Sequence, residues 1–238
     1  MPGSYEDVTS TLAELSALGL YTGVGDVYIA MMTQEDTKTE EPTYSTPVLA
    51  CEAVSVGLTP TFAEGSQSAS DRTIRKVKIL RGMTVAVEYP RIKPAVRCMA
   101  LGRKMDENGG ELVGDGIAPL LAVGVCANRD DGTKLMRWVL KCRASESEVT
   151  ARTAEEGSIT YQIPTITMDG VPLAYETADA AGKAVHLVQY EADTAHAGCK
   201  WTESTFFAEV RGPWSTLPVQ TQTGGSSGQT TGGGSDSP

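Results

Sequence analysis

Cysteine and histidine are the side chains of this sequence best suited to metal binding or nucleophilic chemistry, and their spacing argues against both. The five cysteines form no Cys-x-x-Cys pair. His186 and His196 are ten positions apart, wider than the spacing within common zinc motifs. Cys126 and Cys142 lie in apolar alternating runs, where a free cysteine packs as a small hydrophobe. We therefore expect no metal site and no disulfide.

Other catalytic signatures are also missing. Gly23-Val24-Gly25 lacks the third glycine of a dinucleotide fingerprint and precedes a strand pattern. The sequence has no phosphate-binding loop of the GxxxxGK[ST] type and no GxSxG nucleophile elbow. The adjacent carboxylates Glu155 and Glu156, like Asp130 and Asp131, fall in polar loops where solvation explains them. We expect no catalysis and no cofactor, and an unrecognised hydrolase is the least favoured alternative.

A basic cluster precedes the centre of the chain. It consists of Arg75, Lys76, Lys78 and Arg81 and has a composition able to contact phosphate groups. The net charge of the whole chain is −10, however, and no aromatic residues are interleaved with the cluster for base stacking. The cluster therefore favours a protein partner over nucleic acid.

Charge is divided into three blocks along the chain. Residues 1–73 carry 2 basic and 11 acidic side chains, residues 74–143 carry 14 and 7, and residues 144–238 carry 4 and 12. The blocks therefore have net charges of −9, +7 and −8. They are either solvated faces or complementary surfaces through which the middle of one molecule meets the ends of another.

Length and composition are those of a globular protein. The chain has 238 residues, 40% of them hydrophobic, which is enough to bury a sizeable core. No apolar run reaches the roughly 20 residues needed to span a bilayer. Glu6 and Asp7 stand where a signal peptide carries Lys or Arg, so we expect a cytosol-like compartment.

The strongest element that the sequence predicts is a β-hairpin from Leu120 to Arg143. Asp131-Gly132 is a turn signal, and alternating apolar runs flank it. A two-residue loop at this point would fix the register of the two strands. The cross-strand pairs expected from it are Ala127 with Met136, Val125 with Trp138, Val123 with Leu140, Leu121 with Cys142, Cys126 with Arg137 and Ala122 with Lys141.

Most of the remaining chain also reads as strands. Ile74 to Tyr89 is the longest strand pattern, and Arg81 with Gly82 predicts a bulge inside it. Thr59 to Thr73 lacks periodicity and is expected to be either a floppy loop or a binding arm. Further strands are expected at Val24 to Thr33, Val48 to Leu58, Ile159 to Ile163 and Val185 to Glu191, with a turn at Asp169-Gly170.

Helices should be few and short. Pro94 opens a helix candidate through Arg103, which Glu107-Asn108-Gly109-Gly110 would end. A second short helix is expected from Thr202 to Val210, and a third, capped by Ser4, before Gly19. The Gly, Ser and Thr residues after Thr221 predict a flexible tail.

The order of these segments resembles that of the major tail proteins of long-tailed double-stranded-DNA bacteriophages. The likeness rests on the strand Gly25-Asp26-Val27-Tyr28-Ile29-Ala30, the helix closing in Asn108-Gly109-Gly110 and the hairpin ending in Met136-Arg137-Trp138-Val139-Leu140-Lys141. Ile159 to Thr165 and the Phe206-Phe207 pair agree with the C-terminal half of that family. The resemblance covers Val24 to Val210.

This resemblance implies a mainly β fold, a β-sandwich or barrel-like tail tube domain with a flanking short helix. It divides the chain into an arm at 1–23, a tube domain at 24–219 and a tail at 220–238. The expected function is a structural virion protein without enzymatic activity, which polymerises as stacked hexameric rings into a tube. Expected partners are other copies, the tape measure protein and the DNA that passes through without specific binding. The expected location is the virion tail, assembled in host cytoplasm.

Subunit contacts are expected at the long loop and at the basic residues of the middle block. The alternative from another functional class is a monomeric β-sandwich module that binds a small ligand or a glycan. The residues expected at the subunit interface are Phe62, Asp71, Arg72, Arg75, Lys76, Lys78, Arg137 and Lys141.

Overall fold

The computed structural model describes residues 18–69, 72–146, 161–178 and 182–216, and these residues form a mainly β protein. The expected fold class is confirmed. Within the described residues, no helix is long and apolar enough to cross a membrane. The expected N-terminal helix, the first two residues of the strand expected from Ile159 and the Gly/Ser/Thr tail lie outside the described residues.

Ten strands join into one sheet, and two short strand pairs stand apart from it. The sheet runs in the order β3-β2-β9-β10-β11-β6-β5, while β1, β4 and β14 pair with β9, β2 and β10 respectively. All pairings are antiparallel. The ten strands are β1 (Tyr21–Val24), β2 (Asp26–Gln34), β3 (Thr43–Tyr44), β4 (Val48–Glu52), β5 (Ser55–Ala69), β6 (Arg72–Glu88), β9 (Leu120–Arg129), β10 (Lys134–Glu146), β11 (Thr165–Gly170) and β14 (Gln189–Asp193).

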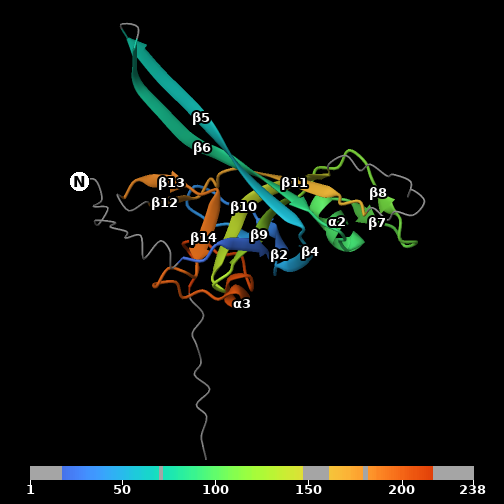
Figure 1. Cartoon of the computed structure of the whole chain (residues 1–238). Coiled ribbons are helices and arrows are strands. Elements are labelled where there is room, and N and C mark those ends of the chain that lie inside the picture. The colour runs from blue at the N-terminus through green and yellow to red at the C-terminus, as the bar shows by residue number, and fades with distance from the viewer. Residues whose placement is uncertain (1–17, 70–71, 147–160, 179–181, 217–238) are drawn as a thin grey trace, which may run out of the picture.

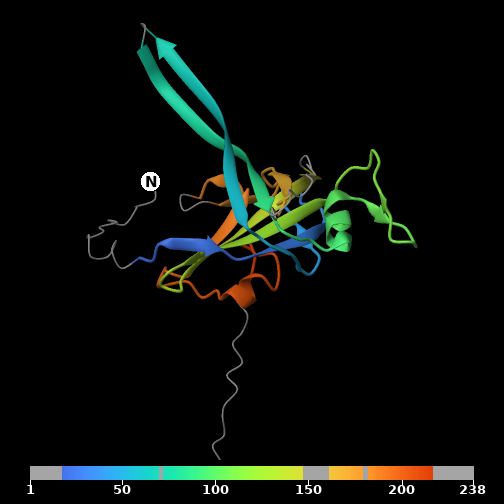
Figure 2. The same ribbon diagram turned by 45° about the vertical axis from the view of Figure 1, so that its right-hand side comes forward.

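The remaining elements lie around this sheet. Figure 1 shows α2 with β7 and β8 on one side of it and α3 below it. Figure 2 shows that the β5–β6 hairpin crosses the sheet and then projects far beyond the body. The elements outside the sheet are β7 (Lys104–Met105), β8 (Glu111–Leu112), β12 (Glu176–Ala178), β13 (Ala184–His186), α2 (Pro94–Leu101) and α3 (Glu203–Phe206).

The two central strands, β9 and β10, are covered on both faces. One apolar cluster lies on the face that carries Val123 and Val139, and it includes residues of β2, β4, β6, β11 and α2. The second lies on the opposite face around Trp138 and is closed by the C-terminal segment with Phe206 and Phe207. Burial of apolar surface stabilises the folded state by about 25 cal/mol for each Å² removed from water. Both faces of β9 and β10 therefore contribute to stability.

The register of the β9–β10 hairpin differs by one residue from the expected one. The loop has three residues, because Arg129 N–H donates to Thr133 and Gly132 adopts a φ of 83°. Leu135 consequently faces Ala127, and Trp138 faces Gly124 rather than Val125. A register shift between Val139 and Cys142 then restores the expected pairing of Leu121 with Cys142.

Trp138 fits this register only because residue 124 is glycine. A Cβ at Gly124 would lie 2.9 Å from the Trp138 ring and 2.9 Å from Phe207. The indole N–H donates to the carbonyl of Phe206 at 3.2 Å, and Phe207 stacks on Tyr28 with ring centroids 4.7 Å apart. The aromatic cluster thus attaches the C-terminal segment to the sheet.

The helix beginning at Pro94 is confirmed, but it ends earlier than expected. Gly102 takes a φ of 67° and caps α2, and its N–H bonds back to the last turn. Gly109 instead belongs to the turn between β7 and β8, where the Asp106 carboxylate accepts from the N–H groups of Asn108 and Gly110. The expected helix from Thr202 is shortened to α3, with Thr202 as its N-cap.

Four further expectations need correction. Thr59 to Ala69 is not a loop but most of β5, paired along its length with β6. Tyr161 to Pro164 forms no strand, and β11 begins only after the proline. Asp169-Gly170 is the end of β11 rather than a turn. The late strand divides into β13 and β14.

Tyr21 and Gly23, which belong to the segment assigned to the arm, pair with residues of β9.

We predict that Gly124→Ala destabilises the protein. The added methyl group has no room between the Trp138 and Phe207 rings, so the free energy of unfolding should fall by about 1–3 kcal/mol, the usual cost of overpacking. The measurement is chemical denaturation followed by tryptophan fluorescence. Gly23→Ala is the matched control, because nothing lies within 4 Å of its added Cβ. Equal stability of the two variants would contradict the proposed role of Gly124.

Candidate assembly surface

The β5–β6 hairpin is the feature of this molecule best suited to contact another one. β11 pairs only with the stretch of β6 from Met83 to Glu88. Between Met83 and the tip of the hairpin, among the described residues, β5 and β6 pair only with each other. Their outer backbone groups are therefore unpaired edges that are open to further strand pairing.

A bulge and a glycine mark the point where the hairpin leaves the sheet. Thr61 pairs with Gly82 and Phe62 with Leu80, so Arg81 is the extra residue of a β-bulge. A Cβ at Gly82 would lie 2.6 Å from the carbonyl oxygen of Gly170. The bulge expected at Arg81 and Gly82 is thus confirmed, and glycine permits the close approach of β11 just before the hairpin diverges.

One face of the projecting hairpin is apolar and exposed. Ala63 pairs with Ile79 and Gly65 pairs with Val77, so these four residues share a face. Ile79 is 50% exposed and Val77 is 38% exposed. Their partners across the ladder are small and cover little of them. Side chains of this kind, exposed on an extended ribbon, indicate a contact surface.

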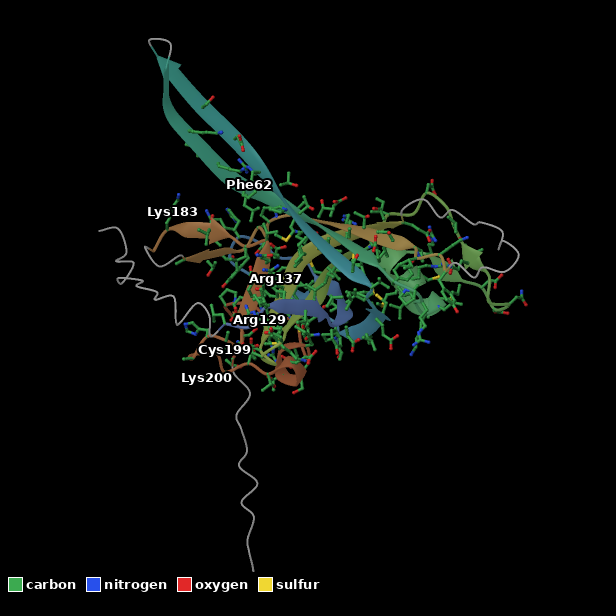
Figure 3. The ribbon with its side chains drawn as sticks, in the orientation of Figure 1. Phe62, Arg129, Arg137, Lys183, Cys199 and Lys200 are labelled. Carbon is green, nitrogen blue, oxygen red and sulfur yellow. The ribbon has the colours of Figure 1, made fainter. Side chains whose placement is uncertain are left out.

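The opposite face is charged and satisfied within the hairpin. Glu64 forms ion pairs with Lys78 at 3.0 Å and with Lys76 at 3.6 Å. The Lys78 ammonium also lies 4.4 Å from the centre of the Phe62 ring. Figure 3 shows Phe62 on the hairpin, well away from Arg137 and Arg129 on the body. These contacts occupy the charged face, which leaves the apolar face as the one without covering groups.

The hairpin brings together most of the residues that the sequence placed at a subunit interface. Phe62, Lys76 and Lys78 lie on it, and Arg72 and Arg75 belong to β6. Asp71 lies outside the described residues. The two remaining residues, Arg137 and Lys141, belong to β10 on the body. Whether these residues contact another subunit stays a prediction.

Lys141 is bound by acidic residues of its own chain. It is 9% exposed, and its ammonium lies 2.8 Å from Asp36 and 2.7 Å from Glu35. Asp36 also accepts from the N–H groups of Ala174 and Tyr175. Burial alone would raise the pKa of Asp36, but these hydrogen bonds outweigh it and hold the pKa below its usual value.

The charge blocks also meet one another within this chain. The basic middle block forms ion pairs with residues of the acidic first and third blocks. Arg129 binds both oxygens of Asp193 at 2.7 Å, and this holds the pKa of that carboxyl below its usual range. Other pairs of this kind are Lys134 with Glu203, Arg137 with Glu191, Arg103 with Glu146 and Arg91 with Glu52.

Sequence reasoning did not identify the exposed apolar face. Val77 and Ile79 alternate like core residues, and the alternation continues through the bulge into Met83 and Val85, which are buried. The available signal was the Arg81-Gly82 interruption, because it separates the part of β6 inside the sheet from the part outside. Among the described residues, no group of three or more His, Cys, Asp or Glu side chains is arranged to hold a metal ion.

We predict that Lys141→Ala is strongly destabilising. It leaves the buried Asp36 carboxylate without its cation, so the free energy of unfolding should fall by roughly 3–5 kcal/mol at neutral pH. Lys38→Ala is the control, because the Lys38 side chain is 74% exposed in its pair with Glu176. Its loss should lower the free energy of unfolding by less than about 1 kcal/mol. Equal losses in the two variants would contradict the assignment.

The pH dependence of stability should follow from the same pair. The lowered pKa of Asp36 stabilises the fold fully above the unfolded carboxyl pKa of about 3.9, and this stabilisation is lost as pH falls through the lower folded pKa. In Lys141→Ala, burial instead favours the protonated carboxyl. The stability difference between wild type and variant should therefore shrink on acidification, measured by denaturation between pH 7 and pH 3. A difference that stayed constant would argue against this pair.

Comparison with known proteins finds matches among solved structures only. No protein-family model matches the chain, and no curated protein is similar to it. Solved structures do match, among them a crystal structure of an Hcp protein with 13% sequence identity. That match covers 68% of this chain and 99% of the other, with a TM-score of 0.29. At this level of similarity the likeness carries no argument about function.

Proposed function

We propose that this chain is a structural subunit that assembles with copies of itself into a tube, as the major tail protein of a long-tailed double-stranded-DNA phage. In this proposal the subunits form stacked hexameric rings and perform no catalysis. The tape measure protein and then the DNA occupy the channel. The protein would be assembled in host cytoplasm and would remain in the virion tail. The sequence resemblance described above supports these finer points.

The observation that carries the proposal is a basic hairpin, exposed on its apolar face, that projects from an acidic body. Between Thr61 and Arg81 there are five Lys or Arg and two Asp or Glu residues, a net charge of +3. The whole chain has a net charge of −10, so the residues outside this segment carry a net charge of −13. Opposite fields of this kind steer a second copy so that its body approaches the hairpin. The exposed apolar side chains then supply a contact to bury.

The geometry of such a contact favours repeated stacking. The hairpin of one molecule would meet the body of the next, so the two contacting surfaces differ. A contact between unlike surfaces closes into a ring or continues as an open stack, depending on its rotation. Self-assembly of this kind requires no ligand and no catalytic group.

The pairing of basic residues within the chain also suits a channel for DNA. Each Lys or Arg that neutralises a phosphate adds affinity through counterion release, and several together would hold the DNA in place. Arg129, Lys134 and Lys141 are engaged by carboxylates of their own chain. They are therefore less available to phosphate, which agrees with DNA that must slide.

We predict that removing the projecting hairpin abolishes stacking and leaves the body folded. β5 pairs with β6, so the projecting parts of both strands must be removed together. A short Asn-Gly turn would then join Thr61 to Gly82. Size-exclusion chromatography and electron microscopy should show stacks or tubes for the parent and none for the variant. Circular dichroism checks that the variant is folded. A folded variant that polymerises like the parent would refute the role of the hairpin.

Assembly should also depend on salt. Raising the ionic strength from about 0.1 M to 1 M shortens the screening length from roughly 10 Å to 3 Å and should reduce stacking, measured by light scattering. Lys78→Gln should weaken assembly more than Lys200→Gln, which changes the total charge equally but lies outside the hairpin. Salt-independent assembly would count against charge attraction. A stable monomer at high concentration would instead favour a ligand- or glycan-binding module.

A further inference from the structure

A groove at the base of the hairpin has the size and lining to receive apolar side chains. It has a volume of about 380 Å³ and lies between β1 and the start of β5. Its floor is formed by Val125 and Leu135 of the central strands, and Val56 and Leu58 form one wall. Tyr21 stands on the other wall. It is a place where the curled sheet is not closed, because β1 and β5 do not pair with each other.

The lining is apolar, and carboxylates lie close to it. Val54, which also lines the groove, is 50% exposed. Ser55 in the wall donates to Glu88 at 2.7 Å, and the guanidinium of Arg137 lies 3.1 Å from Glu191. The cation of Arg137 is therefore balanced by a carboxylate, and Glu88 adds further negative charge. A basic segment with an apolar face fits this combination better than an acidic one.

The hairpin of the same molecule cannot fill its own groove. Leu58 lines the groove, and Ala63, which faces Ile79, lies five residues farther along the same strand. At about 3.3 Å per residue this places Ile79 roughly 16 Å beyond the groove and pointing away with the hairpin. The apolar face must therefore find its groove on a second copy.

We propose that the groove between β1 and β5 binds the apolar face of the hairpin from a second copy, with Ile79 and Val77 entering it. This inference rests on the proposed self-assembly and adds the surface that receives the hairpin. Two features support this occupant. The hairpin segment carries a net charge of +3 against −13 for the rest of the chain, and among the described residues β1 and the projecting hairpin each keep an unpaired strand edge. Added strand pairing at these edges would reinforce the apolar contact.

The first test is a photo-reactive amino acid in place of Ile79 in the full-length chain under assembly conditions. Mass spectrometry should find intermolecular links to residues 21–24, 54–58 or 125–137. Links to another surface of an assembled partner would overturn the groove as the binding site of the hairpin but leave the proposed function standing. The absence of both assembly and intermolecular links would overturn both. The same reactive group at Val54 would contradict the proposal if it captured residues 1–17 instead of the hairpin.

The second test changes the groove itself. Val54→Asp places a carboxylate where an apolar contact is expected, so the apparent association constant should fall about tenfold or more. Val171→Asp is the matched control, because Val171 is 47% exposed, close to the 50% of Val54, and lies outside the groove. Circular dichroism verifies that both variants are folded. Equal assembly of the two variants would overturn the proposed site.

Discussion

The structure depends on the packing of Trp138 against Gly124 across the two central strands. The missing side chain at Gly124 gives the indole its place, and the indole in turn holds Phe206 through its N–H. The C-terminal segment is thereby fixed over one face of β9 and β10, while the strands that curl around the other face form the first apolar cluster. A sheet covered on both sides in this way is a rigid support. The projecting hairpin is an extension of that support.

Ion pairs join distant segments of the body, while the hairpin segment keeps a net positive charge. The bidentate pair between Arg129 and Asp193 and the buried pair between Lys141 and Asp36 join distant segments within one chain. Removing one partner of the buried pair would leave an uncompensated buried charge, which is costly. The hairpin uses Glu64 to hold its lysines on one face and presents Ile79 on the other. It is therefore suited to a contact that combines long-range attraction with short-range burial.

The groove and the hairpin are two ends of one strand pair. β5 begins as a wall of the groove and continues into the free ribbon, so both surfaces are positioned by the same backbone. The bulge at Arg81 sets the direction in which the ribbon leaves the sheet. A repeat distance between copies would then be set by the length of one hairpin. This gives a physical reason for a long, regular hairpin where a short turn would suffice to connect the strands.

The sequence by itself determined the mainly β class, the central hairpin, the bulge at Arg81 and the helix that begins at Pro94, because each depends on local alternation or turn chemistry. It did not determine the three-residue loop at Gly132, since one glycine after two aspartates is compatible with either loop length. Only the tertiary structure decided that Thr59 to Ala69 is a strand, that Lys141 is buried on Asp36, and that Val77 and Ile79 are exposed. Alternation of apolar and polar residues indicates a strand with two different faces. What covers each face is decided by segments far away in the chain.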